Sequence, residues 1–397
     1  MNEHMREHMR LMLPGPTPIP PGVSQVLGRP MINHRGPEFG AMYRACIDGI
    51  RWLFQTEGDV LLLGASSGTG GLEAAVSNVL SAGDQVLALV AGEFGARFAD
   101  MAERFGGKVT RMSVEYGEAF APEAIEAALA TGAFKVLLVT HNETSTAVMQ
   151  PLEAIARAAR RANPDILILV DAVSSLGVVP LPVDAWDLDI VVTGSQKAFM
   201  IPPGLAMASV SARAWKAHET ATAPRYYFDF TQHKQFDAKN QTPWTPALPQ
   251  IYGLYEAFGI MRGEGLDALF ERHETMTRML RAGLAALGLH PVVTRDDIAS
   301  RSVTAVYPPA GIDAEQLRKA VQEQFGLVLA GGQGKMAGKI FRIGHLGFYQ
   351  PLDMLTVLAA LEVVCHRLGA AVPLGAGVRA AQASLLGVGE RETATRV

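Results

Sequence analysis

Short apolar runs recur through the first half of the chain and alternate with segments of helical spacing. The runs lie at 60–63, 85–90, 108–114, 135–140, 166–170 and 190–193. They are nearly continuous, as expected of strands that are covered on both faces. Segments rich in Ala, Leu, Glu and Arg separate the first five, at 71–80, 94–105, 122–130 and 152–162. This alternation predicts an α/β fold with a mostly parallel central sheet, helices on both faces, and ligands at the carboxyl ends of the strands.

The pattern changes after Gly204. The run 205–211 predicts one more strand, and residues 224–249 are rich in aromatic residues and Pro, which we interpret as a long functional crossing. Helical patterns follow at 251–261 and 265–287. The strand-like runs 303–307 and 339–343 then alternate with the helix-like segments 314–325 and 352–368, which indicates a small α+β domain. We therefore expect four parts: an N-terminal segment (1–20), a large domain (21–262), a small C-terminal domain (263–370) and a loosely ordered, glycine-containing tail (371–397).

The amino-acid composition excludes several classes of function. Of 397 residues, 49% are hydrophobic and 19% charged, which favours a large buried core over disorder. The formal net charge of -4 and the lack of a Lys/Arg block argue against binding to nucleic acid. Cys46 and Cys365 are too few for a disulfide framework or a thiolate metal site, and they suit a reducing compartment. No apolar stretch approaches 18 residues, so we expect a cytoplasmic protein, without membrane contact, whose partners are small molecules or its own copies.

A glycine-rich turn connects the first predicted strand to a helix. Residues 64–71 read Gly-Ala-Ser-Ser-Gly-Thr-Gly-Gly, and N–H groups at such a helix N-terminus bind phosphate well. The same string resembles the glycine turn of short-chain dehydrogenases, so a nicotinamide-dependent reductase is one alternative, and a simple tight turn is another. However, about sixty residues precede this strand, and no Tyr is followed by a Lys four positions later. Both features favour a phosphate site.

An acidic and a basic residue follow two neighbouring predicted strands. Asp171 ends the apolar run 166–170, and Lys197 follows the run 190–193, 26 residues further on. A pyridoxal phosphate site needs this pair, because the lysine bonds covalently to the cofactor and the carboxylate keeps the pyridine nitrogen protonated. An ordinary ion pair at a strand end is the simpler alternative. The order of phosphate turn, Asp171 and Lys197 at three strand ends favours the cofactor site.

Several motifs together resemble one known family. They are Pro-Gly-Pro-Thr-Pro (14–18), Ser-Gly-Thr with Leu-Glu-Ala-Ala (67–69, 72–75), Thr-His-Asn-Glu-Thr-Ser-Thr (140–146), Asp-Ala-Val-Ser-Ser-Leu-Gly (171–177), Gly-Ser-Gln-Lys-Ala with Pro-Pro-Gly (194–198, 202–204) and Phe-Arg-Ile-Gly (341–344). Through them, residues 11–368 resemble the class V pyridoxal-phosphate aminotransferases of fold type I, and within these the alanine/serine–glyoxylate branch. The resemblance implies pyridoxal 5'-phosphate as cofactor and a homodimer.

The resemblance also implies individual roles around the cofactor. Residues that would hold its phosphate are Ser67, Gly68 and Thr69, with a further contact from Gln196. Lys197 would be the covalent lysine, and Asp171 would face the pyridine nitrogen. Three further positions match cofactor contacts of the family: Phe94 for the aromatic ring stacked on the cofactor, which is often Trp, Thr144 for a nearby hydroxyl, and Thr245 for a residue that reaches the phosphate of the neighbouring subunit.

On the substrate side, the resemblance implies that Arg342 binds the α-carboxylate, because a planar guanidinium can contact both oxygens. Gly15 and Thr144 would lie beside the substrate. His34 and Arg35 belong to a segment that approaches the active site in this family. Their roles, and that of Glu143, stay open between catalytic and structural.

The implied activity moves an amino group from serine or alanine to glyoxylate or pyruvate. Aminoethylphosphonate, ureidoglycine or aspartate are alternative donors, because only pocket residues separate these enzymes. A cysteine desulfurase would need a nucleophilic Cys in a loop after the lysine, whereas Cys365 lies in a helix-like run. A non-catalytic homologue is disfavoured by the presence of both Lys197 and Asp171.

Overall fold

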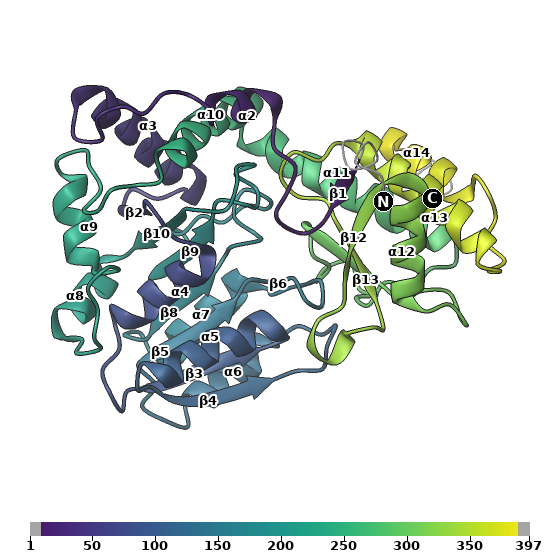
Figure 1. Cartoon of the computed structure of the whole chain (residues 1–397). Coiled ribbons are helices and arrows are strands. Elements are labelled where there is room, and N and C mark those ends of the chain that lie inside the picture. Colours follow the sequence, from purple (N-terminus) through teal and green to yellow (C-terminus); the bar gives the residue numbers. More distant parts are fainter. Residues whose placement is uncertain (1–8, 388–397) are drawn as a thin grey trace.

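The computed structural model describes residues 9–387 (Figure 1). Its large domain is built on a seven-stranded sheet in the order β2-β10-β9-β8-β5-β3-β4. The strands are β2 (Asp59–Leu63), β3 (Gln85–Val90), β4 (Lys108–Ser113), β5 (Val136–Thr140), β8 (Leu167–Asp171), β9 (Ile190–Gly194) and β10 (Ala206–Val210). Strand β10 runs antiparallel to both of its neighbours, and the other pairs are parallel. The predicted α/β fold with a mostly parallel sheet is therefore confirmed.

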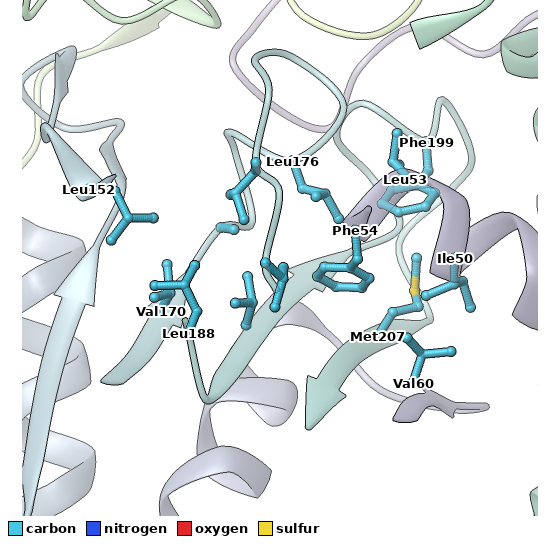
Figure 2. Close-up of a cluster of buried hydrophobic side chains, with 14 of the residues drawn as sticks. Ile50, Leu53, Phe54, Val60, Leu152, Val170, Leu176, Leu188, Phe199 and Met207 are labelled. Atoms are coloured by element: carbon cyan, nitrogen blue, oxygen red, sulfur yellow. The ribbon is translucent and has the colours of Figure 1, made fainter. Parts of the chain in front are cut away.

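Alternate residues of each strand enter two separate cores. Val60 and Leu62 belong to one core, and Leu61 and Leu63 belong to the other. The first core is covered by α2 (Pro21–Val26), α3 (Pro37–Phe54), α6 (Pro122–Leu129), α7 (Leu152–Ala162) and α10 (Leu248–Glu264). The second is covered by α4 (Gly68–Ser77), α5 (Glu93–Arg104), α8 (Ala212–Thr220) and α9 (Phe230–Asp237). Figure 2 shows part of the first core, where Leu53 and Phe54 of α3 lie near the sheet. Burial on both faces fixes the strands whose ends carry the site.

The small domain has its own sheet and core. Its sheet has the order β1-β12-β13-β11, with β1 (Arg10–Met12), β12 (Leu327–Gly331), β13 (Phe341–Gly344) and β11 (Val303–Val306). The helices packed with it are α11 (Leu266–Ala286), α12 (Ala314–Phe325), α13 (Pro351–Arg367) and α14 (Ala376–Leu386). Helix α10 ends at Glu264 beside the boundary that we propose near residue 263. The N-terminal segment contributes β1, which pairs in parallel with β12.

The C-terminal tail differs from the prediction. Within the described part of 371–397, α14 packs against α11 and α13. The buried Glu362 carboxylate accepts hydrogen bonds from the N–H groups of Gly375, Gly377 and Val378, at 2.7, 2.8 and 3.1 Å. The prediction of a loosely ordered tail was therefore wrong for 376–386. The Glu362 carboxylate on α13 accepts hydrogen bonds from backbone N–H groups at the start of α14, which have no acceptor within the helix. Residues 388–397, and residues 1–8 of the predicted N-terminal segment, lie outside the described residues.

None of the helices found between residues 9 and 387 combines the length and the apolar character needed to cross a membrane.

Candidate active site

A cavity lies where β2, β8 and β9 end. It has about 600 Å³ of space between atoms, part of it open to solvent, a size typical of small-molecule sites. The structure brings these predicted site residues into its lining: Ser67, Gly68, Thr69, Phe94, Thr144, Asp171, Gln196 and Lys197. The remaining lining residues were not predicted: Leu72, Arg97, Asn142, Val173 and Ser174.

The N-terminus of α4 forms one end of the cavity. Ser67 caps the helix, and its hydroxyl accepts a hydrogen bond from the N–H of Gly70 at 3.2 Å. The first-turn N–H groups of Gly68 and Thr69 have no intrahelical acceptor, so an anion in the cavity could accept from them. A Cβ at Gly68 would lie 2.8 Å from Val173, which explains why the smallest residue stands here. The Gln196 amide also lines this end, and an anion could accept a hydrogen bond from its NH₂ group. This end therefore fits a phosphate group.

Asp171 and Lys197 line the same cavity. The buried Asp171 accepts a hydrogen bond from the N–H of Val173 at 2.9 Å, and burial raises its pKa to about 6. The Lys197 amine donates to the carbonyl oxygen of Pro14 at 2.6 Å. Burial lowers the pKa of Lys197 to about 8, although the Asp171 carboxylate opposes this shift. The pKa values of both groups are thus shifted toward 7, which suits a site that exchanges protons near pH 7.

The N-terminal segment packs directly on Lys197. A Cβ at Gly15 would lie 2.5 Å from the lysine Nζ atom, and the φ angle of Gly15, +141°, also favours glycine. The Thr17 hydroxyl donates to the carbonyl oxygen of Lys197 at 3.0 Å, and the Thr17 N–H donates to the carbonyl oxygen of Gln196 at 3.2 Å. The structure thus places Gly15 beside the Lys197 amine.

A hydroxyl network forms another wall of the cavity. The hydroxyls of Thr144 and Ser174 lie 2.8 Å apart. The Asn142 amide donates to Ser174 and to Ser302, each at 2.8 Å. Asn142 and Ser174 were not predicted as site residues, although both lie inside the motifs 140–146 and 171–177. Sequence spacing could have indicated them, because both motifs directly follow strand ends.

Phe94 is positioned by a buried acid. The Glu143 carboxylate accepts hydrogen bonds from the N–H groups of Phe94 and Gly95, at 3.1 and 3.0 Å, and from the Ser145 hydroxyl at 2.5 Å. It lies at the N-terminus of α5, where a negative charge is favourable. Burial raises the pKa of Glu143, and these hydrogen bonds oppose the shift. Glu143 therefore fixes the start of α5, while the guanidinium of Arg97 lies 5.0 Å from the centre of the Phe94 ring.

Arg342 approaches the cavity from strand β13 of the small domain. The residue is 5% exposed. Its Nε donates to the carbonyl oxygen of Gly331 at 2.8 Å. Its Nη1 donates to the carbonyl oxygen of Thr144 at 2.9 Å and to the side-chain oxygen of Gln333 at 3.2 Å. Burial lowers its pKa to about 10, so the guanidinium remains cationic at neutral pH. Thr144 joins Arg342 to the cavity wall, and Gln333 is a contact that the sequence did not predict.

Three residues that the sequence analysis singled out, Thr245, Arg35 and His34, lie outside the lining of this cavity. Thr245 is exposed and lines a separate small hollow with Tyr227 and Trp244. Arg35 donates to the carbonyl oxygens of Thr242 and Pro243, at 2.6 and 3.1 Å. It therefore ties the N-terminal segment to the crossing, and neither it nor His34 lines the cavity. Within residues 9–387, no group of three or more His, Cys, Asp or Glu side chains could hold a metal ion.

Comparison with known proteins identifies the family. Residues 24–344 match the family described as "Aminotransferase class-V". The chain is 44% identical to the soluble hydrogenase small subunit of Synechococcus sp. (strain PCC 6716), over 95% of this chain and 98% of that protein. It is 39% identical to the L-aspartate–glyoxylate aminotransferase of Paracoccus denitrificans, over 94% and 95%. The crystal structure of pyridoxamine-pyruvate aminotransferase from Mesorhizobium loti superimposes with a TM-score of 0.91, at 31% identity and 98% and 99% coverage. The chain belongs to the class V aminotransferase family, whose members normally bind pyridoxal phosphate.

Proposed function

We propose that the chain is a pyridoxal-phosphate-dependent aminotransferase that moves an amino group from serine or alanine to glyoxylate or pyruvate. The observation that carries the proposal is one cavity with a lysine amine, a buried carboxylate and a helix N-terminus around it. When bound, the cofactor supplies an electron sink that acidifies the α-proton of an attached amino acid. The glyoxylate acceptor is supported by the relative named as an L-aspartate–glyoxylate aminotransferase.

The cavity residues divide between holding the cofactor and tuning it. Ser67, Gly68 and Thr69 bind the phosphate at the start of α4, and Gln196 adds a side-chain contact. One oxygen of Asp171 accepts a hydrogen bond from the Val173 N–H, and a cationic pyridine N–H at the other oxygen would favour the carboxylate form. Burial raises the pKa of Asp171 to about 6, and a positive partner beside it would lower this pKa again.

Lys197 carries the proton in this proposal. With a pKa of about 8, a useful fraction of its amine is neutral near pH 7.5 and can accept the α-proton as a general base. The protonated amine then returns that proton as a general acid. The carbonyl of Pro14 and the backbone of Gly15 keep the amine in place between these steps. Arg342 orients the substrate by its α-carboxylate.

The first test combines spectroscopy with a substrate panel. Purified protein should show the visible absorbance of a lysine-linked cofactor, and borohydride should trap the link at Lys197, as read by mass spectrometry. Serine, alanine, aspartate, ureidoglycine and aminoethylphosphonate are then assayed against glyoxylate and pyruvate. We expect the highest kcat/KM for serine or alanine with glyoxylate. Absence of the absorbance or of turnover would refute the aminotransferase, and preference for another donor would refute the proposed donor class.

The proposal includes a homodimer, motivated by exposed aromatic residues next to the cavity. Tyr226 is 77% exposed, and its ring and that of Tyr227 stack on Trp244, with centres 5.2 and 5.8 Å apart. The Tyr227 hydroxyl donates to the carbonyl oxygen of Ala65, which precedes the phosphate turn. Such clustered exposed aromatics are typical of interfaces. We propose that a second copy covers them and that Thr245 reaches the phosphate site of that copy.

We expect light scattering at micromolar concentration to give the mass of a dimer. Trp244→Ala should weaken the dimer by about 30-fold or more, because a buried aromatic anchor contributes about 2 kcal/mol or more to an interface. Leu352→Ala is the control, because Leu352 is also exposed, at 69%, but lies on the small domain. A fully active monomer would contradict the prediction.

A further inference from the structure

Gln333 lies in the glycine-rich loop between β12 and β13, just before a short 3-10 helix, η1 (Gly334–Met336). Its side-chain oxygen lies 3.2 Å from Nη1 of Arg342. A guanidinium can only donate hydrogen bonds, so the amide must direct its oxygen toward Arg342. The NH₂ group of Gln333 is then left as a free pair of donors beside the carboxylate-binding arginine.

The backbone of this loop is fixed on both sides. The N–H of Gly332 donates to the carbonyl oxygen of Ile340 at 3.1 Å, and the N–H of Met336 donates to the carbonyl oxygen of Gln333 at 2.9 Å. Gly334 packs so closely on the Glu93 carboxylate that a Cβ there would collide with it, and its φ of +51° also favours glycine. Gln333 is therefore held in place and does not belong to a freely moving loop.

The loop also contacts the large domain where Phe94 enters the cavity. Glu93 begins α5 immediately before Phe94, and it accepts a hydrogen bond from the Tyr116 hydroxyl at 2.8 Å. Gln333 therefore stands between Arg342 and the start of α5. Charged groups of both signs surround this point: Glu93 and the buried Glu143 are acidic, and Arg318 and Lys335 are cations of the same region besides Arg342.

We propose that Gln333 is a specificity-determining residue that favours an amino donor with a hydroxyl side chain. The inference rests on the proposed function. In this proposal the α-carboxylate binds Arg342, the α-amine faces Lys197, and the donor side chain turns toward Gln333, which lies beside Arg342. The Gln333 NH₂ can donate to the serine oxygen, and the methyl of alanine offers it no acceptor. The side-chain carboxylate of aspartate would meet an amide that carries no charge to pair with it, next to a glycine that packs on the Glu93 carboxylate, so aspartate is favoured less than serine at this position.

Two substitutions at Gln333 test its role in donor selection, because one removes the amide donor and the other replaces it with a cation. Gln333→Leu should lower the ratio of kcat/KM for serine to that for alanine by about 3- to 10-fold, the effect of one neutral hydrogen bond. Gln333→Arg should raise the ratio for aspartate to serine by about 10-fold or more, because a second guanidinium can pair with the side-chain carboxylate. The matched controls are Gln316→Leu and Gln316→Arg, on the exposed surface of α12, and neither should change these ratios.

An equilibrium measurement separates this proposal from the proposed function. Calorimetry of the purified protein compares succinate with propionate, which differ by one carboxylate, and Gln333→Arg should tighten succinate relative to propionate by about 10-fold. If no donor is turned over, the proposed function fails while this binding comparison still tests Gln333. If both Gln333 variants alter all donors by one common factor, or leave the two ratios and the succinate preference unchanged, Gln333 does not select the donor and the proposal is overturned.

Discussion

The Lys197→Ala variant should lose transamination by a factor on the order of 10³ or more, while it still folds and still binds pyridoxal phosphate. The substitution removes both the covalent attachment point and the group that carries the proton, and each of these contributes a large part of the rate. The helix N-terminus at Ser67 and the Asp171 carboxylate remain, so the cofactor keeps its noncovalent contacts. Stability should change by only about 1 to 2 kcal/mol, because the depressed pKa shows that this charged amine is not favoured by burial.

Three measurements check this result. Thermal unfolding by circular dichroism reports the fold, absorbance after gel filtration reports retained cofactor, and a coupled assay reports turnover. Lys234→Ala is the control, because Lys234 of α9 forms a surface ion pair with Asp59 at the start of β2. We expect this variant to keep activity near that of the unsubstituted protein. Substantial turnover by Lys197→Ala would show that another base moves the proton.

Strong local patterns explain which parts of the fold could be predicted. Strands β2, β3, β5, β8 and β9 are nearly continuous apolar runs, and burial on both faces makes such runs easy to identify. Strand β1 has three residues, and its partner β12 lies more than 300 residues further along the chain. The pairing of such short, distant strands leaves no periodic signal. Helix α9 was also missed within the crossing, although Asp229 caps it through a hydrogen bond to the N–H of Thr231 at 2.8 Å.

The candidate site also contains residues that local sequence patterns could predict and residues that they could not. Asp171, Lys197 and the phosphate turn each follow a strand directly, so the parallel sheet brings them together without any further information. The surroundings of Arg342 depend on how a loop of the small domain meets the 140–146 motif, and Gln333 could be found only from that contact. Thr245 lies outside the cavity of its own chain, and its predicted role requires a second copy that a single sequence cannot place.

Arg342→Ala should lower kcat/KM toward serine and alanine by about 30- to 1,000-fold, which corresponds to about 2 to 4 kcal/mol. The charge-assisted contact between the α-carboxylate and Nη2, which has no acceptor among the described residues, is lost in this buried site, and water replaces it poorly. The variant should also unfold at a lower temperature, because the carbonyl oxygens of Gly331 and Thr144 lose their donor. The absorbance of the bound cofactor should not change, because Arg342 touches neither the α4 N-terminus nor Asp171 in the described contacts.

Comparison of variants separates carboxylate binding from simple loss of structure. Arg342→Lys should recover part of the efficiency, because an ammonium supplies the charge without the planar fork. Amines that lack a carboxylate should lose much less activity in Arg342→Ala, if they react with the enzyme at all. Arg278→Ala is a suitable control, because this arginine of the same domain forms a surface ion pair with Glu271 on α11. If Arg342→Ala has the same kcat/KM for serine and alanine as the unsubstituted protein, the α-carboxylate must be bound elsewhere. The placement of the donor side chain beside Gln333 would then have no support.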